Sequence, residues 1–213
     1  SNANTVAFTQ GTTASINIVA QSFLAPRLQA GDNIVTTIME HHANFIPWQM
    51  LAQKYQVELR LVPIDKNGDL ELVQLSNFLD KETKLLAISH ISNTLGTIHP
   101  LDEIIELAKR KDIPVLVDAA QSACHFEIGV DPLNCDFLTF SGHKMFGPFG
   151  IGILQVSEKY IADMMPYNYG GGIIKDVKVE ETSFRNFPHN LDAGTPNVSS
   201  VIGLAAALKF ISG

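Results

Sequence analysis

Cysteine is scarce in this chain. Cys124 and Cys135 are the only two among 213 residues, and they form neither a C-x-x-C pair nor another metal-ligand spacing. A disulfide-stapled scaffold and a cysteine-based zinc site are therefore excluded. Both residues lie in or beside apolar segments, so we expect buried, unreactive thiols and no disulfide in a cytosolic protein.

Long apolar runs and clusters of basic residues are missing as well. The longest apolar stretch, residues 201–208, is too short to cross a bilayer, and no charged-then-apolar secretory leader opens the sequence. The 15 Lys and Arg residues are scattered and outnumbered by 22 acidic ones, which leaves a net charge of -7. This balance disfavours a phosphate-backbone partner. We expect a cytoplasmic protein that binds neither membrane nor nucleic acid.

The hydrophobic content of 46% is enough for a substantial core. We predict one large domain over residues 4–213. Residues 1–3 read S-N-A and resemble the remnant of a cleaved tag. A strand-like run follows at once, and the chain stops just beyond a helical stretch, so we expect a piece of a longer protein, truncated at both ends.

Short β-branched runs alternate with stretches of helical periodicity along the chain. This pattern is typical of βα units that feed a mostly parallel sheet, and it predicts a three-layer α/β domain with seven strands. In such sheets ligands bind beyond the carboxyl ends of the strands. The predicted strands are 6–9, 33–38, 58–63, 85–89, 115–118, 137–140 and 151–156, and the predicted helices are 13–23, 45–55, 71–79, 101–111 and 198–210.

A lysine follows the predicted strand 137–140, in the segment S-G-H-K that ends at Lys144. A desolvated amine there can form a Schiff base with an aldehyde cofactor, although a turn with a solvent-facing lysine would look the same. Upstream, the strand 115–118 ends in Asp118, and Gln121 follows three residues later. An acid for a pyridinium nitrogen, an amide for the phenolic oxygen and a lysine for the aldehyde together fit pyridoxal phosphate (PLP). These residues therefore predict a PLP enzyme.

Polar residues also follow the first two strands. Gly11, Thr12 and Thr13 offer backbone N–H groups and two hydroxyls to a phosphate, although an ordinary helix N-cap has the same composition. His41, in the segment E-H-H-A-N, could stack on a cofactor ring or move protons. A metal site at the adjacent histidines would need a third ligand that the sequence does not show, so we predict no metal.

Three later segments are open to two interpretations each. Asn93, in S-N-T-L-G, could bond a cofactor phenolate or the substrate, or could stabilise a turn. The Y-G-G-G segment at 169–172 suits either a moving lid or a passive connection. Thr195, in D-A-G-T-P-N before the last predicted helix, offers either a second phosphate contact or a capped turn.

In this order, the segments E-H-H-A-N, S-N-T-L-G, V-D-A-A-Q, S-G-H-K and A-G-T-P-N resemble the class V aminotransferase fold, and within it the Suf-type cysteine desulfurases and selenocysteine lyases. The resemblance runs from residue 6 to residue 211 and implies the large domain of a fold-type-I PLP-dependent transferase. It implies that Lys144 carries the cofactor aldehyde, that Asp118 pairs with the ring nitrogen and that Gln121 contacts the phenolic oxygen. The other implied contacts are His41 over the ring with Asn93 nearby, Thr13, Ser141 and His143 on the phosphate, and Thr195 on the phosphate of the other subunit of a homodimer.

The resemblance also implies a reaction. The intact enzyme would convert cysteine to alanine, with Lys144 or His41 moving protons, and would pass the sulfur as an enzyme persulfide to an acceptor protein for iron–sulfur cluster assembly. In the family, the persulfide-forming cysteine and the arginine that binds the substrate carboxylate lie in a segment that this chain lacks, so we expect this piece to be inactive alone.

Two alternatives to a cysteine desulfurase stay open. One is a selenocysteine lyase, or another PLP-dependent elimination enzyme, on the same scaffold. The other is a cofactor-binding or dimerisation module without turnover.

Overall fold

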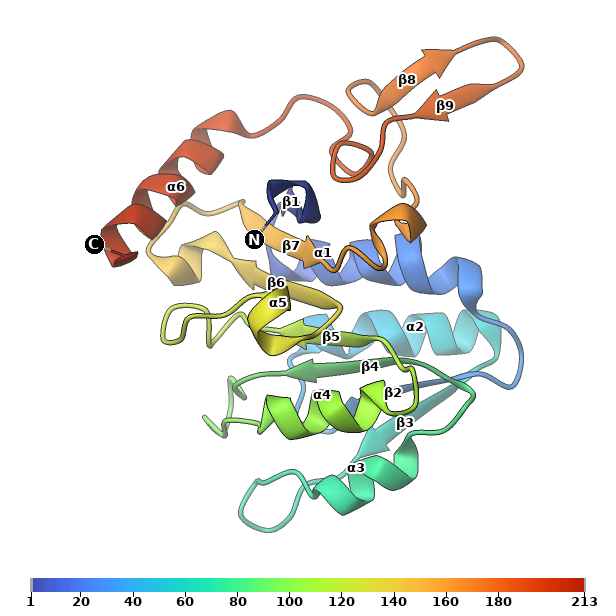
Figure 1. Cartoon of the computed structure of the whole chain (residues 1–213), viewed down its shortest axis with the longest axis vertical. Helices are drawn as coiled ribbons and strands as arrows, with labels where there is room; N and C mark the ends of the chain where they lie inside the picture. The colour runs from blue at the N-terminus through green and yellow to red at the C-terminus, as the bar shows by residue number, and fades with distance from the viewer. Residues whose placement is uncertain (1, 213) are drawn as a thin grey trace.

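A seven-stranded sheet forms the centre of the molecule (Figure 1). The computed structural model describes residues 2–212, except for the side chains at positions 130 and 132; Ser1, part of the predicted tag remnant, lies outside this range. The strand order is β1-β7-β6-β5-β4-β2-β3, in which β7 runs antiparallel to both β1 and β6 while the other pairs are parallel. The mostly parallel, seven-stranded sheet that the sequence predicts is confirmed. The strands are β1 (Val6–Thr9), β2 (Asn33–Thr37), β3 (Glu58–Val62), β4 (Thr83–Ser89), β5 (Val115–Asp118), β6 (Phe137–Ser141) and β7 (Gly152–Val156).

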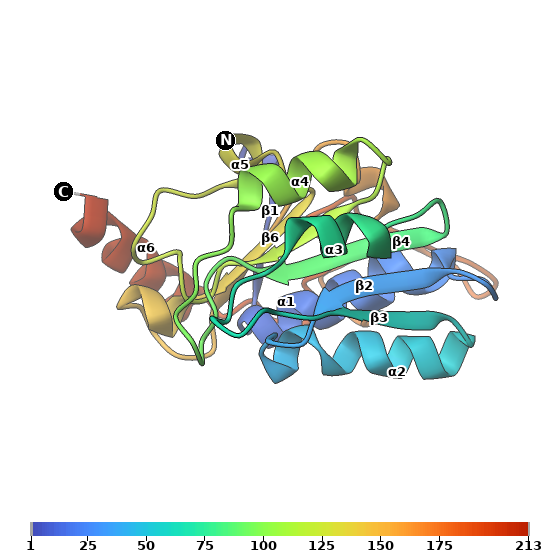
Figure 2. The same cartoon turned by 90° about the horizontal axis from the view of Figure 1, so that it is seen from below.

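Helices cover both faces of the sheet and complete three layers (Figure 2). One face is covered by α1 (Thr12–Ile18), which continues as a π-helical segment, Val19–Leu24, and by α2 (Ile46–Tyr55). The other face is covered by α3 (Leu72–Phe78), α4 (Leu101–Lys109) and the short α5 (Val130–Leu133).

Strand β4 shows why the sequence favours this layering. Leu85 and Ala87 pack into the cluster beneath α1 and α2, whereas Leu86 and Ile88 pack into the cluster beneath α3 and α4. A strand that is buried on both faces needs a continuous apolar run rather than alternation. The four residues are fully buried.

Two parts lie outside these layers. The hairpin of β8 (Ile174–Val177) and β9 (Thr182–Phe184) projects from the body, and every residue of β8 is exposed (Figure 1). The helix α6 (Val198–Ser212) rests on Met145 and Ile151 through its one buried side chain, Leu204. No helix within residues 2–212 has the length and the apolar content to span a membrane.

Two glycine backbones meet where β7 passes the turn that starts α1. A Cβ built on Gly152 would lie 2.4 Å from the Gly11 Cα and 2.8 Å from the Phe140 oxygen. Gly11 has a φ of 139°, a conformation that L side chains rarely adopt. Just beneath, the Ser15 hydroxyl donates to the Ile153 carbonyl at 3.2 Å. The start of α1 is therefore held directly against β7.

Replacing Gly152 by Ala should push these backbones apart. Because the clash is with backbone atoms rather than a flexible side chain, we expect the free energy of unfolding to fall by about 1–3 kcal/mol. Urea denaturation measures the change. Gly170→Ala is the matched control, because a Cβ at Gly170 meets nothing within 4 Å; equal stability of the two variants would contradict the close approach.

Candidate functional site

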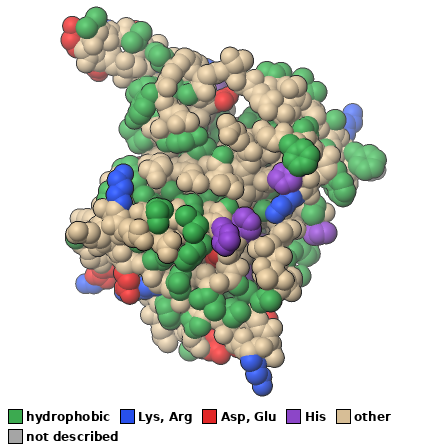
Figure 3. Space-filling model, turned by 180° about the vertical axis from the view of Figure 1, so that it is seen from behind, with side chains coloured by type: hydrophobic (Ala, Val, Ile, Leu, Met, Phe, Trp, Pro, Cys, Tyr) green, Lys and Arg blue, Asp and Glu red, His purple; other side chains and the backbone are tan. Residues whose placement is uncertain are grey.

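Nine of the ten residues that the sequence singles out line one cavity of about 200 Å³. The cavity lies where β4, β5 and β6 end, as expected for a parallel sheet. On the face shown in Figure 3, histidine side chains gather near the middle, while acidic side chains lie mostly toward the edges. The roles of the nine residues stay predictions. They are Thr12, Thr13, His41, Asn93, Asp118, Gln121, Ser141, His143 and Lys144.

Lys144 reaches the cavity from a short 3-10 helix, Gly142–Met145, that continues β6. The buried Met145 fixes this turn against Ile151, and the Gly142 N–H donates to the Ile151 carbonyl at 2.8 Å. Lys144 itself is partly buried and lines the cavity. A lysine placed in this way can meet an electrophile bound in the cavity.

Asp118 lines the cavity at the end of β5. Asp118 is 5% exposed, and one of its carboxylate oxygens accepts a hydrogen bond from the Ala120 N–H at 2.9 Å. Burial raises the pKa of Asp118, and the Ala120 N–H and the charges of Lys144 and His41 oppose that rise. A cation bound in the cavity would stabilise the ionised carboxylate.

Two hydroxyls join the start of α1 to the end of β6. The Thr12 N–H donates to Ser141 Oγ at 2.9 Å, and Thr12 Oγ1 lies 2.9 Å from the same oxygen. Thr13 is exposed beside them. Backbone N–H groups of a first helical turn lack partners within the helix, so this corner suits a phosphate or another anion.

His41 borders the cavity on the loop that follows β2. Its Nδ1 accepts a hydrogen bond from the Ala43 N–H at 3.1 Å, so Nε2 carries the proton in the neutral ring. The imidazole is exposed, and can therefore exchange protons with a bound molecule.

Glu40, which precedes His41, was missed by the sequence analysis. Its carboxylate accepts hydrogen bonds from Thr37, Asn44 and Ser89. Burial raises the pKa of Glu40 to about 7, with the charge of Asp118 adding to the effect and the hydrogen bonds opposing it. A signal was visible in the sequence, because Glu40 is an acid that closely follows a buried strand.

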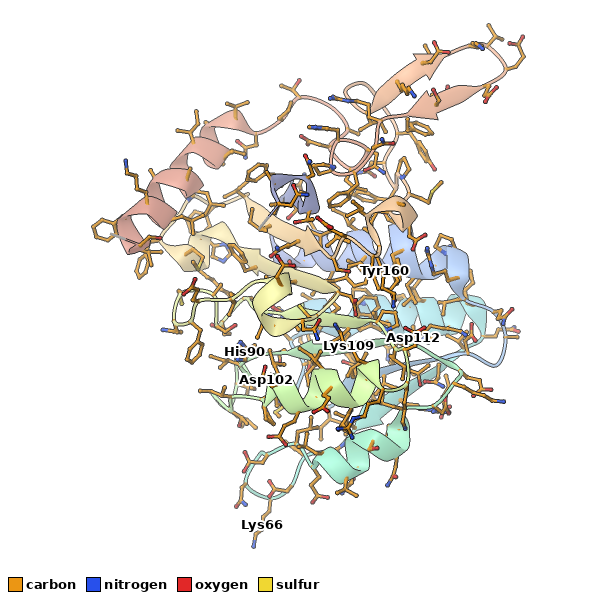
Figure 4. All side chains as sticks on the ribbon, viewed as in Figure 1. Lys66, His90, Asp102, Lys109, Asp112 and Tyr160 are labelled. Atoms are coloured by element: carbon orange, nitrogen blue, oxygen red, sulfur yellow. The ribbon has the colours of Figure 1, made fainter. Side chains whose placement is uncertain are left out.

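Asn93 lies on a loop that returns on itself between His90 and His99. The His99 N–H donates to the His90 carbonyl at 2.9 Å, and His99 Nδ1 lies 2.6 Å from the Ser89 carbonyl oxygen. Nε2 of His99 and Nδ1 of His90 are buried and have no hydrogen-bond partner within residues 2–212. Burial lowers the pKa of both rings, and for His90 the neighbouring Asp102 of α4 opposes the shift (Figure 4).

Some residues of interest lie elsewhere. Thr195 is exposed and lines a different cavity, of about 540 Å³, with Gln10 and Tyr167. Both cysteines are free in the structure, and Cys124 is only partly buried, which corrects the expectation of two buried thiols. Cys135 is buried, and burial raises its thiol pKa to about 12. Among the described residues, no three His, Cys, Asp or Glu side chains are grouped to hold a metal ion.

The chain is similar to known proteins in sequence and in fold. The family model "Aminotransferase class-V" matches residues 1–213. A cysteine desulfurase of Escherichia coli O7:K1 (strain IAI39 / ExPEC) is 47% identical over 211 residues, which cover 99% of this chain and 52% of that protein. The chain thus spans about half the length of the curated relatives it matches.

Two solved structures extend the comparison. The cysteine desulfurase CsdA of Escherichia coli, as its S-sulfonic acid, matches with a TM-score of 0.96 and 38% identity, over 99% of this chain and 53% of that one. A C-DES mutant with glycine covalently linked to its PLP cofactor matches with a TM-score of 0.88 and 26% identity, over 99% of this chain and 56% of that one.

The buried His99 and the half-buried His90, at the base of the Asn93 loop, predict a dependence of stability on pH. A base whose pKa is lowered by folding stabilises the fold above its unfolded pKa, about 6.5 for histidine, and that stability is lost as the pH falls through the folded value. His99→Asn keeps a donor toward the Ser89 carbonyl but cannot titrate.

We expect wild type to lose on the order of 1 kcal/mol more stability than His99→Asn between pH 7.5 and pH 5, measured by urea denaturation at each pH. The exposed His125, changed to Asn, is the control and should follow wild type. Parallel pH profiles for wild type and His99→Asn would show that His99 does not titrate against the fold.

Proposed function

Because the chain belongs to the class-V aminotransferase family, we propose that it is the cofactor-binding part of a PLP-dependent cysteine desulfurase. One observation carries the proposal: Lys144, Asp118 and the Thr12–Ser141 corner border the same cavity. An amine, a buried carboxylate and an anion-binding corner are the three groups that PLP requires. The 47% identity to a cysteine desulfurase supports the choice of reaction within the family.

The residues present fit this cofactor. Asp118 is buried without a cationic hydrogen-bond partner among the described residues, and the protonated pyridine nitrogen would supply one. Thr12, Thr13 and Ser141, together with His143, would hold the phosphate. Gln121 would contact the phenolic oxygen. When bound, PLP supplies an electron-withdrawing ring that stabilises negative charge next to the substrate amine.

Three side chains would then act around the bound molecule. Lys144 Nζ would hold the cofactor covalently until a substrate amine displaces it, and would afterwards be free to move a proton. His41, whose neutral ring carries its proton on Nε2, would cover the ring and could exchange a second proton. Asn93 would lie against the cofactor or the substrate.

The proposed substrate is free cysteine. A protein thiolate would attack the substrate sulfur, the new S–S bond forming as the Cβ–S bond breaks, and the carbon would take up a proton to give alanine. The persulfide would pass to a sulfur-acceptor protein, for iron–sulfur cluster assembly in the cytoplasm. Selenocysteine, in place of cysteine, is the second candidate, because the sequence motifs also resemble those of selenocysteine lyases.

We propose that neither cysteine of this chain is the attacking thiolate. Cys135 lies before β6, at the end of the strand opposite to Lys144, and its thiol pKa of about 12 keeps it protonated at neutral pH. Cys124 does not line the cavity; its thiol lies 3.8 Å from the Gln121 carbonyl oxygen, which it can reach as a donor.

A homodimer would complete the site. Thr195 lies outside its own chain's Lys144 cavity, so a contact with the cofactor phosphate would have to come from a second copy. Exposed apolar side chains next to this region, Phe149 at 82% and Ile202 at 65%, suit burial in such an interface.

The cofactor assignment predicts the spectrum of the chain mixed with PLP. Wild type should develop the visible absorption band of protein-bound PLP, and Lys144→Ala should lack it. Lys159→Ala is the control: Lys159 follows β7, which runs antiparallel to β6, so it lies at the opposite edge of the sheet from Lys144, and its amine donates a hydrogen bond to Asp112 at 3.0 Å. Asp112 and Tyr160, which both contact Lys159, are labelled in Figure 4. Asp118→Asn should weaken PLP binding about ten- to a hundredfold, because a charge-assisted hydrogen bond is lost. Loss of the band in Lys159→Ala but not in Lys144→Ala would refute the assignment.

The dimer predicts that Thr195 acts across subunits. Analytical ultracentrifugation of the PLP-loaded chain should show a dimer, and Thr195→Ala should lower PLP affinity roughly tenfold by removing a hydrogen bond to a charged group. Thr182→Ala, an exposed threonine on β9, is the matched control. A monomer with full PLP occupancy would rule out the contact.

The third expectation concerns turnover. The PLP-loaded 213-residue chain should form less than one alanine per site from cysteine, because a positioned thiolate is required and neither Cys124 nor Cys135 supplies it. Amino-acid analysis of the reaction over time measures alanine. Many turnovers that persist in a Cys124→Ser, Cys135→Ser double variant would contradict the persulfide route, and turnovers that vanish in it would show that one of these thiols reacts.

A further inference from the structure

The carboxylate of Glu40 connects three segments that meet behind the cavity. Its Oε1 accepts hydrogen bonds from Thr37 Oγ1 at 2.9 Å and from the Ser89 N–H at 3.1 Å, with the Ser89 hydroxyl at 3.3 Å. Its Oε2 accepts from Asn44 Nδ2 at 2.6 Å. Thr37 ends β2 and Ser89 ends β4, while Asn44 closes the short turn after His41. One side chain therefore links two strand ends to the His41 loop.

The network continues into the core. Asn44 is fully buried, and its Oδ1 accepts a hydrogen bond from Trp48 Nε1 at 3.1 Å. Trp48 is also fully buried and is the single tryptophan of the chain. Because the Asn44 amide donates to Glu40 and accepts from Trp48, its orientation is determined at both ends.

His41 lies in the sequence between Glu40 and Asn44, the two residues that form this network. Glu40 precedes it and Asn44 follows it by three residues, while the Asn44 N–H also donates to the His41 carbonyl at 2.7 Å. His41 and Ser89 both line the cavity, whereas Glu40 lies behind them. The exposed imidazole makes few contacts of its own, so its place depends on the backbone that Glu40 and Asn44 hold.

We propose that Glu40 is a positioning residue: its carboxylate fixes the loop 40–44 against the end of β4 and thereby holds His41 over the cavity. The inference rests on the proposed function for the identity of the bound molecule, PLP, and not for the geometry of the loop. A carboxylate suits this place because every group that faces it is a donor. Asp118 at the end of β5 is the charged group that acts on Glu40, and His41 is the titratable group next to Glu40 in the chain.

Glu40→Gln tests the link at a single atom. The Gln carbonyl can still accept from Thr37 and Ser89, but its NH2 group would then face the NH2 group of Asn44. Two donors cannot pair, so one of the two amides must turn over. Turning the introduced amide would set its NH2 group against the Ser89 N–H and remove the acceptor of Thr37 Oγ1, whereas turning the Asn44 amide breaks only the bond to Trp48. We therefore expect Asn44 to turn and Trp48 Nε1 to lose its acceptor. Trp48 fluorescence, read without PLP, should therefore change, and so should the NMR signal of the His41 imidazole.

A second change should repair the first. In the double variant Glu40→Gln, Asn44→Asp, the Gln NH2 group donates to one oxygen of the carboxylate introduced at position 44, and Trp48 donates to the other oxygen. We expect Glu40→Gln to bind PLP about tenfold more weakly and to alter the visible circular dichroism of the bound cofactor, and the double variant to return to within about twofold of wild type. Glu106→Gln, on the exposed face of α4, is the matched control and should behave as wild type.

Each outcome decides one claim. Wild-type Trp48 fluorescence and an unmoved His41 signal in Glu40→Gln would overturn the positioning role, whatever PLP does. A double variant that binds PLP as weakly as Glu40→Gln would overturn the positioning role too. In that case the hydrogen bonds would be restored while the position of His41 would not. Failure of both variants to fold would show that the carboxylate is needed by the fold itself, and the proposal would fall. A wild-type chain that never binds PLP would contradict the proposed function alone, since the Trp48 and His41 readouts need no cofactor.

Discussion

The hydrogen bond from the Thr12 N–H to Ser141 Oγ joins residues that are far apart in the chain, and the arrangement of the site depends on it. It ties the start of α1 to the end of β6, three residues before Lys144. The turn that starts α1 also lies directly against β7, the neighbour of β6, and it can do so only because Gly11 and Gly152 carry no side chains. The corner proposed for a phosphate and the turn that carries the lysine are thus one packed unit, anchored in the sheet.

The acidic group of the site is buried, whereas its basic groups lie nearer to solvent. Asp118 is deep, and its pKa is raised because burial disfavours its charged form, while Lys144 and His41 stand nearer to solvent and oppose that shift. Glu40 lies behind the wall of the cavity, where donors surround its carboxylate. A cavity lined both by a buried acid and by hydroxyls and N–H groups suits a molecule that carries a cationic ring and an anionic group.

Much of the fold and of the site could be predicted from the sequence, because a parallel sheet brings the residues that follow its strands to one edge. Asp118, Asn93 and Lys144 each follow a continuous apolar run, and all three line the cavity. Glu40 was overlooked because its partners, Thr37 and Ser89, come from different strands, and a single sequence does not show which strand ends are neighbours. The hairpin of β8 and β9 was missed because its exposed residues form no apolar face, and α5 because it spans only 4 residues. The role proposed for Thr195 requires a second copy of the chain, which the structure of a single chain does not contain.

Covalent mapping of the cofactor tests the central claim most directly. The chain is mixed with PLP, reduced with borohydride and digested, and the modified peptide is identified by mass spectrometry. The account predicts a single reduced adduct, on Lys144, because this is the only described lysine that lines the cavity containing Asp118. An adduct confined to another lysine would contradict the account.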